Sequence, residues 1–536
     1  MKSIIFCLFG LFFSLLLSKP ALSQQRSYDL IVYGGTASGV MTAVAASREH
    51  LRVAIIEPGD HVGGMLTSGL SGTDVANPDV IGGLAREFFD RMGAHYHAER
   101  FGHSTAWNFE PYVGEAVLRQ MLAEAKVDVF YNERLKEQGA VDKQHGHIIS
   151  IRTDDNQAWK ASVFADCSYE GDLMAQAEVA FTIGREGTDK YGEELAGVRA
   201  ETPMNQLPDY VSAYGPDGKL LPQISPVPLA KAGTADDKVQ AFNFRLILSR
   251  NRSNQLPFDK PGNYRASDYA LLHRALLQLS KEKGRNLRLA DALRTVPIPN
   301  EKADFNNIGG FSTDYLNESW VYLTESYARR AQIFQQHIAY TKGLMYFLAH
   351  DPGVPTSIRS ELNLWGYAKD EFKNSGQWPF QLYIREGRRM TSDFVLTQKD
   401  LQTSRTKRDT IGLGSHNIDS HNVQRIVTSN GFALNEGDVQ EHVQPYALPY
   451  SILVPKQSEA SNLLVPICVS ASHVAYSSLR MEPQYMILGQ AAGIAAAVAV
   501  QNRTTVQAVN IEVLQNKLKA ADAILSYPIT TNYIVQ

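Results

Sequence analysis

One glycine-rich segment has the residue types and spacing that suit the binding of a pyrophosphate. Gly34-Gly35-Thr36-Ala37-Ser38-Gly39 follows a short apolar run and precedes an alanine-rich stretch. Glycine allows a tight turn and close backbone approach, and the free N–H groups at a helix start attract phosphate. Glu57, after the next apolar run, can accept hydrogen bonds from ribose hydroxyls and would repel a 2′-phosphate. The pattern predicts an adenine dinucleotide site and disfavours NADP.

One position departs from the usual glycine spacing of such a turn. Thr36 stands where a second glycine normally lets the backbone approach the phosphates. The hydroxyls of Thr36 and Ser38 could donate hydrogen bonds there instead. A purely structural glycine turn in an unrelated α/β protein is the alternative interpretation.

A strand, a helix and a second strand are the elements that would hold these residues. Residues 28–33 and 53–56 are apolar and rich in β-formers, and residues 40–50 form a helical stretch between them. Strand, glycine turn, helix, strand and terminal acid fit within about 30 residues, as a Rossmann-type unit requires. The turn therefore has the context of a dinucleotide-binding site.

Two histidines are candidates for proton transfer. His473 lies just before Arg480-Met481-Glu482-Pro483, and His421 follows Asp419 by two residues. On a strand that spacing places both side chains on one face, where Asp419 would orient the imidazole. Such a histidine could remove a proton from a hydroxyl group. A structural, hydrogen-bonded role is the alternative for each histidine.

A run of charged residues follows the apolar segment 382–384. It contains Arg385, Glu386, Arg388 and Arg389. The run could be an internal ion-pair lattice, a phosphate clamp or an anchor for an anionic substrate. Glu386 and Arg388 are the members that we consider as catalytic candidates.

Beyond Glu57 the sequence resembles the FAD-dependent oxidoreductase family. The similarity is found in the segments Pro58 to Leu70, Trp107 to Pro111, Phe164 to Asp172, Gly366 to Phe372, Tyr383 to Met390 and Arg480 to Gly493. It therefore spans most of the chain. It implies bound FAD and redox chemistry, although some members of the family have carried polysaccharide-lyase labels.

The motifs and the resemblance together predict the residues that contact FAD. These are Gly34, Gly35, Thr36, Ala37, Ser38, Gly39, Glu57, Pro58, His61, Gly63, Gly64, Met65, Gly489, Gln490, Ala492 and Gly493. The segment from Gly489 to Ala497 is interpreted as a helix start whose dipole would stabilise the negative charge of a reduced flavin. A tightly packed core helix is the alternative for that segment.

Residues 1–23 have the order of a cleaved secretory signal. Lys2 precedes an apolar run from Ile4 to Leu17, and small residues follow up to Ser23. The run is shorter than the ~20 residues that span a bilayer. We expect a secreted or periplasmic protein with no stable membrane insertion after cleavage. The formal charge of −4 becomes 50 − 56 = −6 when Lys2 and Lys19 are removed.

The predicted fold class is α/β. A Rossmann-like FAD-binding domain of the two-dinucleotide-binding type would be interrupted by an inserted α+β substrate domain. The expected ranges are 27–180 for the first part of the FAD-binding domain, 181–380 for the inserted region, 381–504 for the second part and 505–536 for a C-terminal helix and tail. Strand-like pieces at 127–131, 147–151 and 159–165 are expected to form a β-meander, and Phe334, Ile338, Thr341, Met345 and Leu348 one buried helical face.

Composition excludes several other classes of protein. A formal charge of −4 over 536 residues is unlike a nucleic-acid-binding protein with a strongly basic surface. Three cysteines cannot build a disulfide scaffold, and no metal site is predicted. Two cysteines, Cys167 and Cys468, lie beyond the predicted signal. They could form a disulfide, but two separate buried thiols fit their apolar surroundings better.

The expected activity is hydride transfer between flavin N5 and a small polar substrate, with a carbohydrate-like or hydroxylated compound as the leading candidate. The electron acceptor and the oligomeric state are not indicated by the sequence. The alternatives are an extracellular polysaccharide lyase or hydrolase that reuses the fold, and a non-catalytic FAD-binding protein.

Overall fold

The first sheet contains the predicted strand–helix–strand unit at its centre. The computed structural model describes residues 26–199, 202 and 204–528, so the predicted signal at 1–23 lies outside the described residues. β1 (Arg26–Tyr33) lies between β2 (Val53–Ile56) and β6 (Ala158–Asp166), and all three are parallel. β3 (Asp128–Phe130) extends the sheet beyond β2, and β20 (Leu463–Leu464) pairs in parallel with β6. Both ends of the chain therefore contribute to one sheet.

The predicted β-meander is confirmed only in part, because the pieces at 147–151 and 159–165 pair antiparallel but the first piece does not join them. β3 and β6, two of its three pieces, join the parallel sheet on opposite sides of the β1–β2 pair. Only β4 (Val141–Gln144) and β5 (His147–Arg152) form an antiparallel hairpin, which continues into the first residues of β6. β6 is the longest strand of this group, and its apolar second half is fully buried, as in a central parallel strand.

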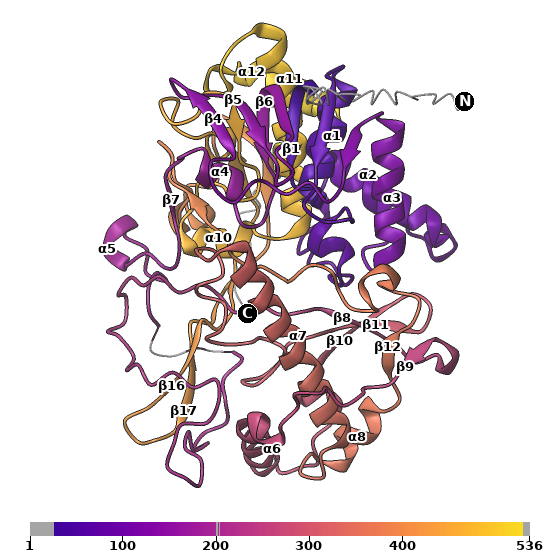
Figure 1. Ribbon diagram of the computed structural model, residues 1–536, viewed down its shortest axis with the longest axis vertical. Helices are drawn as coiled ribbons and strands as arrows, with labels where there is room; N and C mark the ends of the chain where they lie inside the picture. The colour runs from indigo at the N-terminus through magenta and orange to yellow at the C-terminus, as the bar shows by residue number, and fades with distance from the viewer. Residues whose placement is uncertain (1–25, 200–201, 203, 529–536) are drawn as a thin grey trace, which may run out of the picture.

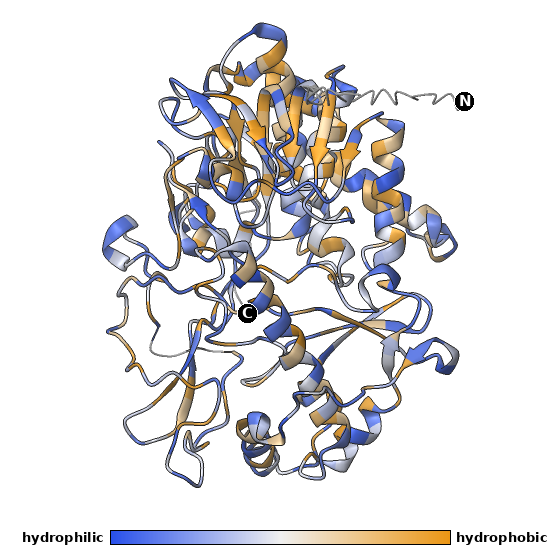
Figure 2. Ribbon diagram, in the orientation of Figure 1, coloured by the Kyte–Doolittle hydropathy of each residue, from blue (hydrophilic) through white to orange (hydrophobic). Residues whose placement is uncertain are grey.

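Two helices pack against each other behind this sheet. α1 (Ala37–Arg48) starts at the glycine turn, and α11 (Glu482–Asn502) lies along it. Figure 1 shows α1 and α11 beside the sheet in the upper half of the molecule, with α2 and α3 further to the right. Figure 2 shows that the strands of this sheet are the most hydrophobic part of the view. The other α-helices outside residues 246–368 are α2 (Gly83–His95), α3 (Pro111–Glu124), α4 (Asp172–Gln176), α5 (Thr188–Tyr191), α9 (Gln398–Gln402), α10 (His473–Leu479) and α12 (Ile511–Ala520).

α11 is long and apolar enough to cross a membrane by length and composition, and it is the one such helix among the described residues. However, 94% of its most apolar stretch is buried inside the fold. Helices that are apolar all round are typical of the core of large proteins. We therefore interpret α11 as the core helix of the cofactor-binding half.

A second, antiparallel sheet is built only from residues between 246 and 368. Its order is β10-β11-β8-β12-β9. The strands are β8 (Leu246–Ser249), β9 (Gln255–Leu256), β10 (Arg294–Ile298), β11 (Lys302–Asn306) and β12 (Gly366–Ala368). The helices of the same stretch are α6 (Ala270–Lys283), α7 (Tyr327–His350) and α8 (Thr356–Leu362), which lie in the lower half of Figure 1.

α7 carries the predicted buried face, with one residue placed differently. Thr341, Met345 and Leu348 are buried as expected, and Ile338 is half-buried. Phe334, also half-buried, lines the cavity next to Glu57. This helix therefore contributes both to the core and to the wall of the candidate cofactor site.

Short two-stranded ladders complete the fold. They are β7 (Phe181–Thr182) with β13 (Arg389–Met390), β14 (Thr410–Gly414) with β19 (Tyr446–Pro449), β15 (Ile418–Ser420) with β18 (Val439–Glu441), and β16 (Gln424–Val427) with β17 (Ala433–Glu436). The β16–β17 hairpin makes bridges to Ser212 and Ser225, so it lies with the loops of the predicted inserted region. Residues 424–436 thus lie beside loops of the predicted inserted region, whereas β14 packs on α11.

Candidate functional site

The glycine turn after β1 is shaped by close backbone contacts. Gly34 has φ +95°, and a Cβ there would lie 2.9 Å from the carbonyl carbon of Cys167 at the end of β6. A Cβ on Gly39 would lie 2.0 Å from the carbonyl oxygen of Gly34. Both positions therefore require glycine, as the sequence predicts.

Thr36 has a different function from the one predicted for its hydroxyl. It is the N-cap of α1, where it accepts a hydrogen bond from Gly39 N at 3.1 Å and donates one to Cys167 O at 2.8 Å. The side chain is thus used inside the fold, and the turn keeps its backbone N–H groups at the helix start. Ser38 is fully buried toward α11, where its carbonyl oxygen lies close to Gly489, so its hydroxyl is not available to a cofactor on the outer side of the turn.

Glu57 lies at the end of β2, where the sequence places it. Its carboxylate accepts hydrogen bonds from Gly35 N and Gly59 N, each at 2.6 Å. Burial raises the pKa of Glu57 to about 7. The residue borders a cavity of about 320 Å³ whose wall contains many of the predicted FAD contacts. From that set the wall includes Gly34, Thr36, Glu57, Pro58, His61 and Gly64, and it is completed by residues such as Arg134, Ser168 and Gln381.

His61 forms the outer edge of this cavity. Its ring stacks on Phe380 with a centroid distance of 4.0 Å, and its Nδ1 pairs with Glu115 at 3.0 Å. Burial acts to lower the pKa of His61, but the Glu115 carboxylate holds it above the ordinary value. His61 is therefore fixed by protein contacts and presents its stacked ring pair to the cavity.

The segment after Gly63 connects the cavity to the start of α11. Gly63 and Gly64 have φ values of +102° and +56°, and Met65 N donates to the hydroxyl oxygen of Tyr169 at 2.9 Å. That hydroxyl donates to Glu482 Oε1 at 2.6 Å, and burial raises the pKa of Glu482 to about 8. Tyr169 and Glu482 lie in segments that carry the family resemblance, but nothing in their spacing shows that they meet.

Buried polar atoms without partners show that this region suits a polar group such as FAD. Among the described residues, Glu482 Oε2 and both polar atoms of the Gln484 side chain make no hydrogen bond. Such atoms are costly to bury unless a ligand or water satisfies them. Together with the glycine turn and the cavity beside Glu57, they fit a dinucleotide cofactor that extends from β2 toward the start of α11.

The predicted contacts Gly489, Gln490, Ala492 and Gly493 are corrected by the structure. α11 begins at Glu482, so Gly489 is in the middle of the helix and not at its start. A Cβ on Gly489 would lie 2.3 Å from Ser38 O, and one on Gly493 would lie 2.3 Å from Thr42 O. Ala492 is fully buried, and Gln490 Oε1 accepts a hydrogen bond from Leu84 N at 2.8 Å. These residues pack helices together, which was the alternative interpretation of the segment.

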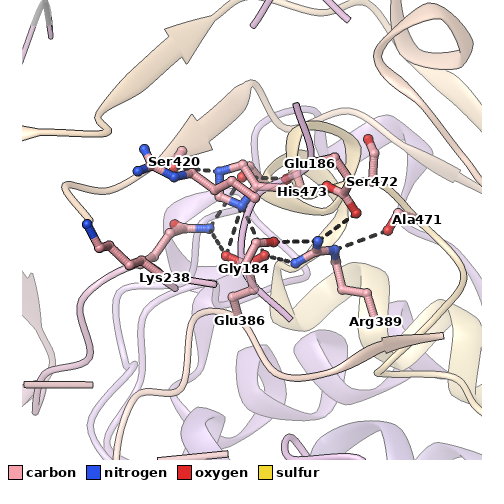
Figure 3. A network of polar contacts seen from close by, with 12 residues as sticks. Gly184, Glu186, Lys238, Glu386, Arg389, Ser420, Ala471, Ser472 and His473 are labelled. Carbon is pink, nitrogen blue, oxygen red and sulfur yellow. Dashed lines mark hydrogen bonds and ion pairs between the residues drawn. The ribbon is translucent and has the colours of Figure 1, made fainter. Parts of the chain in front are cut away.

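His473 and Glu386, both predicted as catalytic candidates, are brought together in a buried network (Figure 3). His473 Nδ1 lies 2.9 Å from Glu386 Oε1, and its backbone N–H donates to Glu186 at 2.9 Å. Burial opposes ionisation of Glu386, but the charges of His473 and Arg389 hold its pKa below the ordinary value. His473 Nε2 lies 3.3 Å from Ser420 Oγ, so both ring nitrogens have partners. This histidine is better suited to positioning than to proton exchange with a substrate.

His421 has a freer ring. Its Nδ1 lies 2.9 Å from Asp314 Oδ2, whereas Asp419, the predicted partner, is 3.8 Å from Nε2. The acid that contacts Nδ1 is therefore Asp314, which comes from a segment over 100 residues away, whereas the predicted acid Asp419 faces Nε2 at ion-pair distance. Nε2 of His421 makes no hydrogen bond within the described part of the chain. Burial, together with the charge of Arg385, lowers the pKa of His421.

The two histidines belong to one network. Gln240 Oε1 accepts from His421 N at 2.9 Å, and Gln240 Nε2 donates to Glu386 at 3.3 Å. Arg480 Nη2 donates to Asp419 O at 2.7 Å, and Arg480 lies two residues before Glu482. A continuous set of contacts therefore joins His421 to the start of α11 and the cofactor cavity.

Of the three alternatives predicted for the arginine run, the structure supports the internal ion-pair lattice. Arg388 pairs with Asp172 at 2.8 Å and donates to Glu170 O at 2.8 Å, although its Nε has no hydrogen-bond partner among the described residues. Arg385 pairs with Asp314 and Arg389 with Glu186, each at 2.8 Å. Arg388 is thus a structural residue.

Cys167 and Cys468 are free and fully buried thiols, as the sequence favours. Within residues 26–528, apart from the gaps noted above, no group of three or more His, Cys, Asp or Glu residues is arranged to hold a metal ion.

The fold and the site define a dinucleotide-binding flavoprotein of the α/β class. A family model described as FAD dependent oxidoreductase matches residues 29–518. Because the match covers most of the chain, the protein belongs to the FAD-dependent oxidoreductase family, and FAD is its cofactor. Among curated proteins no sequence matches this chain significantly.

Solved structures resemble only part of the chain. L-amino acid deaminase from Proteus vulgaris is 16% identical over 30% of this chain and 53% of its own, with a TM-score of 0.24. Thioredoxin reductase from T. acidophilum is 18% identical over 26% and 35%, with a TM-score of 0.17. OxyS anhydrotetracycline hydroxylase from Streptomyces rimosus is 14% identical over 34% and 41%, with a TM-score of 0.20.

Proposed function

We propose that this protein is an exported FAD-dependent oxidoreductase that transfers a hydride between a small hydroxylated substrate and the flavin. The observation that carries the proposal is the orientation of His421 by Asp314, with no hydrogen bond to Nε2 among the described residues, in a network that reaches the start of α11. When bound, FAD supplies the hydride chemistry at its N5 atom. Export rests on the sequence pattern of residues 1–23.

His421 would act as the proton acceptor. Its lowered pKa keeps the imidazole neutral near pH 7, which is the form that can accept a proton. Asp314 holds Nδ1 and so fixes which nitrogen remains available. The Asp314 carboxylate would also stabilise the imidazolium that forms when a substrate hydroxyl gives up its proton.

The substrate is proposed to be small and polar because the surroundings of His421 are densely hydrogen-bonded. Arg480 is buried, and its Nε has no hydrogen-bond partner among the described residues. Tyr383, which is also buried, has two guanidinium groups near its ring centroid, Arg385 at 4.8 Å and Arg245 at 5.9 Å. Donors of this kind suit the oxygens of a hydroxylated compound.

The test is anaerobic flavin reduction with a panel of sugars, polyols and hydroxy acids. A substrate should bleach the flavin absorbance, and His421→Asn should slow that reduction by a factor of about 10² to 10⁴, the usual contribution of a general base. His103→Gln, a substitution at an exposed histidine, is the matched control and should leave the rate unchanged. Equal rates in both variants would remove His421 from the mechanism.

The other functions considered give different results in the same assay. A lyase or hydrolase would form product with no change in flavin absorbance. A non-catalytic FAD-binding protein would show neither product nor bleaching with any compound. Once a reducing substrate is known, the electron acceptor can be identified by reoxidation with oxygen or with soluble quinones.

A further inference from the structure

A second cleft lies along α7, on the part of the helix that follows Phe334, and it is separate from the cofactor cavity in its lining residues. Its volume is about 630 Å³, within the range of small-molecule sites. The lining comes from three further segments, at 222–223, 263–269 and 315–318. α7 itself runs through the centre of Figure 1 and contributes Tyr340 to this cleft.

Four tyrosines make up the aromatic part of the cleft. Tyr315 stacks face to face on Tyr340, with ring centroids 4.1 Å apart and planes 6° from parallel. Tyr269 stacks on Tyr264 at 5.9 Å and on Tyr340 at 6.2 Å. Tyr269 and Tyr340 are buried and have hydrogen-bonded hydroxyls, whereas Tyr264 and Tyr315 are half-buried. The cleft therefore has a rigid aromatic floor with two rings at its surface.

The polar groups at the rim are available for hydrogen bonding. The hydroxyls of Tyr264 and Tyr315, the Glu318 carboxylate and the Gln336 amide have no hydrogen-bond partner in the described part of the chain. These groups provide both donors and acceptors around the aromatic floor. That combination suits a ligand with apolar ring faces and many hydroxyl groups.

The charges around the cleft favour a neutral ligand. Asp268 is paired with Arg265 at 3.1 Å, and Glu318 lies within the field of Arg329. Beside Tyr264, Asp351 adds a third acid and Lys260, 5.8 Å from the ring centroid, adds a third base, so the cleft has no excess charge that would select a cation for the tyrosine faces.

We propose that this cleft is a carbohydrate-binding site, distinct from the flavin site, that takes a neutral saccharide. A pyranose ring would pack its C–H face on Tyr315, and its hydroxyls would bond Glu318 and Gln336. The site would hold a glycan chain near the enzyme whether or not the flavin reacts with sugars. The inference therefore stands apart from the proposed reaction.

The experiment is a titration of the FAD-loaded protein with cellobiose, maltose, xylobiose and chitobiose, followed by isothermal calorimetry and saturation-transfer NMR. At least one disaccharide should bind saturably, and Tyr315→Ala should raise its Kd at least about tenfold. Glu318→Gln should raise the Kd by a smaller factor. Tyr210→Ala is the matched control, since Tyr210 is 74% exposed and lies outside the cleft.

Tyr315→Phe is a second variant that separates a loss of binding from a folding defect. It keeps the stack on Tyr340 and removes only the hydroxyl, which has no hydrogen-bond partner among the described residues. All variants should keep their flavin content and thermal midpoint close to those of the parent protein. The proposal is overturned if no disaccharide binds, if binding is unchanged in Tyr315→Ala and Glu318→Gln, or if tetramethylammonium binds there and the disaccharides do not.

Discussion

Replacing Glu482 by glutamine should make the stability of this protein less dependent on pH. Glu482 is fully buried at the start of α11, where it accepts a hydrogen bond from Tyr169 at 2.6 Å. Burial raises its pKa from 4.5 to about 8, so the folded protein holds a proton that the unfolded chain releases. The glutamine side chain has the same shape and can accept the same hydrogen bond, but it does not titrate.

The sign and the size of the effect follow from these two pKa values. Between pH 4.5 and pH 8 the folded state binds more protons than the unfolded state, so the stability from this group is lost as the pH rises. With a folded pKa of about 8, the loss from pH 5 to pH 8 is about 3.5 kcal/mol. Glu482→Gln should remove that part of the pH dependence and be relatively more stable at pH 8.

The measurement is urea unfolding of the FAD-loaded protein at pH 5, 6, 7 and 8, followed by flavin fluorescence and far-UV circular dichroism. The difference in unfolding free energy between the variant and the parent should change steadily with pH. Glu441→Gln, at an exposed position, is the control and should run parallel to the parent. A constant difference between Glu482→Gln and the parent from pH 5 to pH 8 would refute a neutral Glu482.

Three further substitutions test the cofactor turn, the helix packing and a buried charge cluster. Gly39→Ala should abolish FAD binding, because the new Cβ would lie 2.0 Å from Gly34 O. The measurement is flavin absorbance per protein. The control is Gly262→Ala, which should stay yellow because no atom lies within 4 Å of the added Cβ. Gly489→Val should lower the thermal midpoint, with a cost of about 1–3 kcal/mol or more for overpacking against Ser38; an unchanged midpoint would contradict the packing of α1 on α11. Lys302→Met should destabilise the protein by about 3–5 kcal/mol, since Lys302 Nζ lies 2.7–2.8 Å from Glu110, Asp370 and Glu371. That loss of stability should be smaller at pH 5 than at pH 8. Burial raises the pKa of Glu371 to about 7, so at pH 5 this carboxyl is protonated and does not need the charge of Lys302. A larger loss at pH 5 than at pH 8 would contradict this account of the cluster.

The dinucleotide-binding unit was predictable because its signals are local. Gly34, Gly39 and Glu57 lie within 24 residues, and each is required by the geometry of one turn or one strand end. The alternation of apolar strands with a helix, the placement of the glycines and the acid at the strand end therefore indicate the dinucleotide-binding unit directly. The confirmed part of the prediction is the part in which neighbours in sequence are also neighbours in space.

Helix boundaries were the weak point of the predicted C-terminal motif. The run of small residues after Gly489 looks like the start of a helix, but Pro483 at the first turn marks the true start of α11 seven residues earlier. Small residues at Gly489 and Gly493 allow close packing on α1 just as well as they allow close approach to a cofactor. Only the three-dimensional contacts distinguish the two functions.

The arginine run shows why the catalytic candidates could not be separated from sequence alone. Arg385, Arg388 and Arg389 are close in sequence, yet they pair with Asp314, Asp172 and Glu186, which come from three distant segments. One of these partners, Asp314, also orients His421, and Arg389 contacts Glu386, which holds His473. The run therefore fixes both histidines through acids that no local pattern reveals. His473 has hydrogen-bond partners on both ring nitrogens, whereas Nε2 of His421 has no hydrogen bond among the described residues, so the same lattice that supports the two residues favours different functions for them.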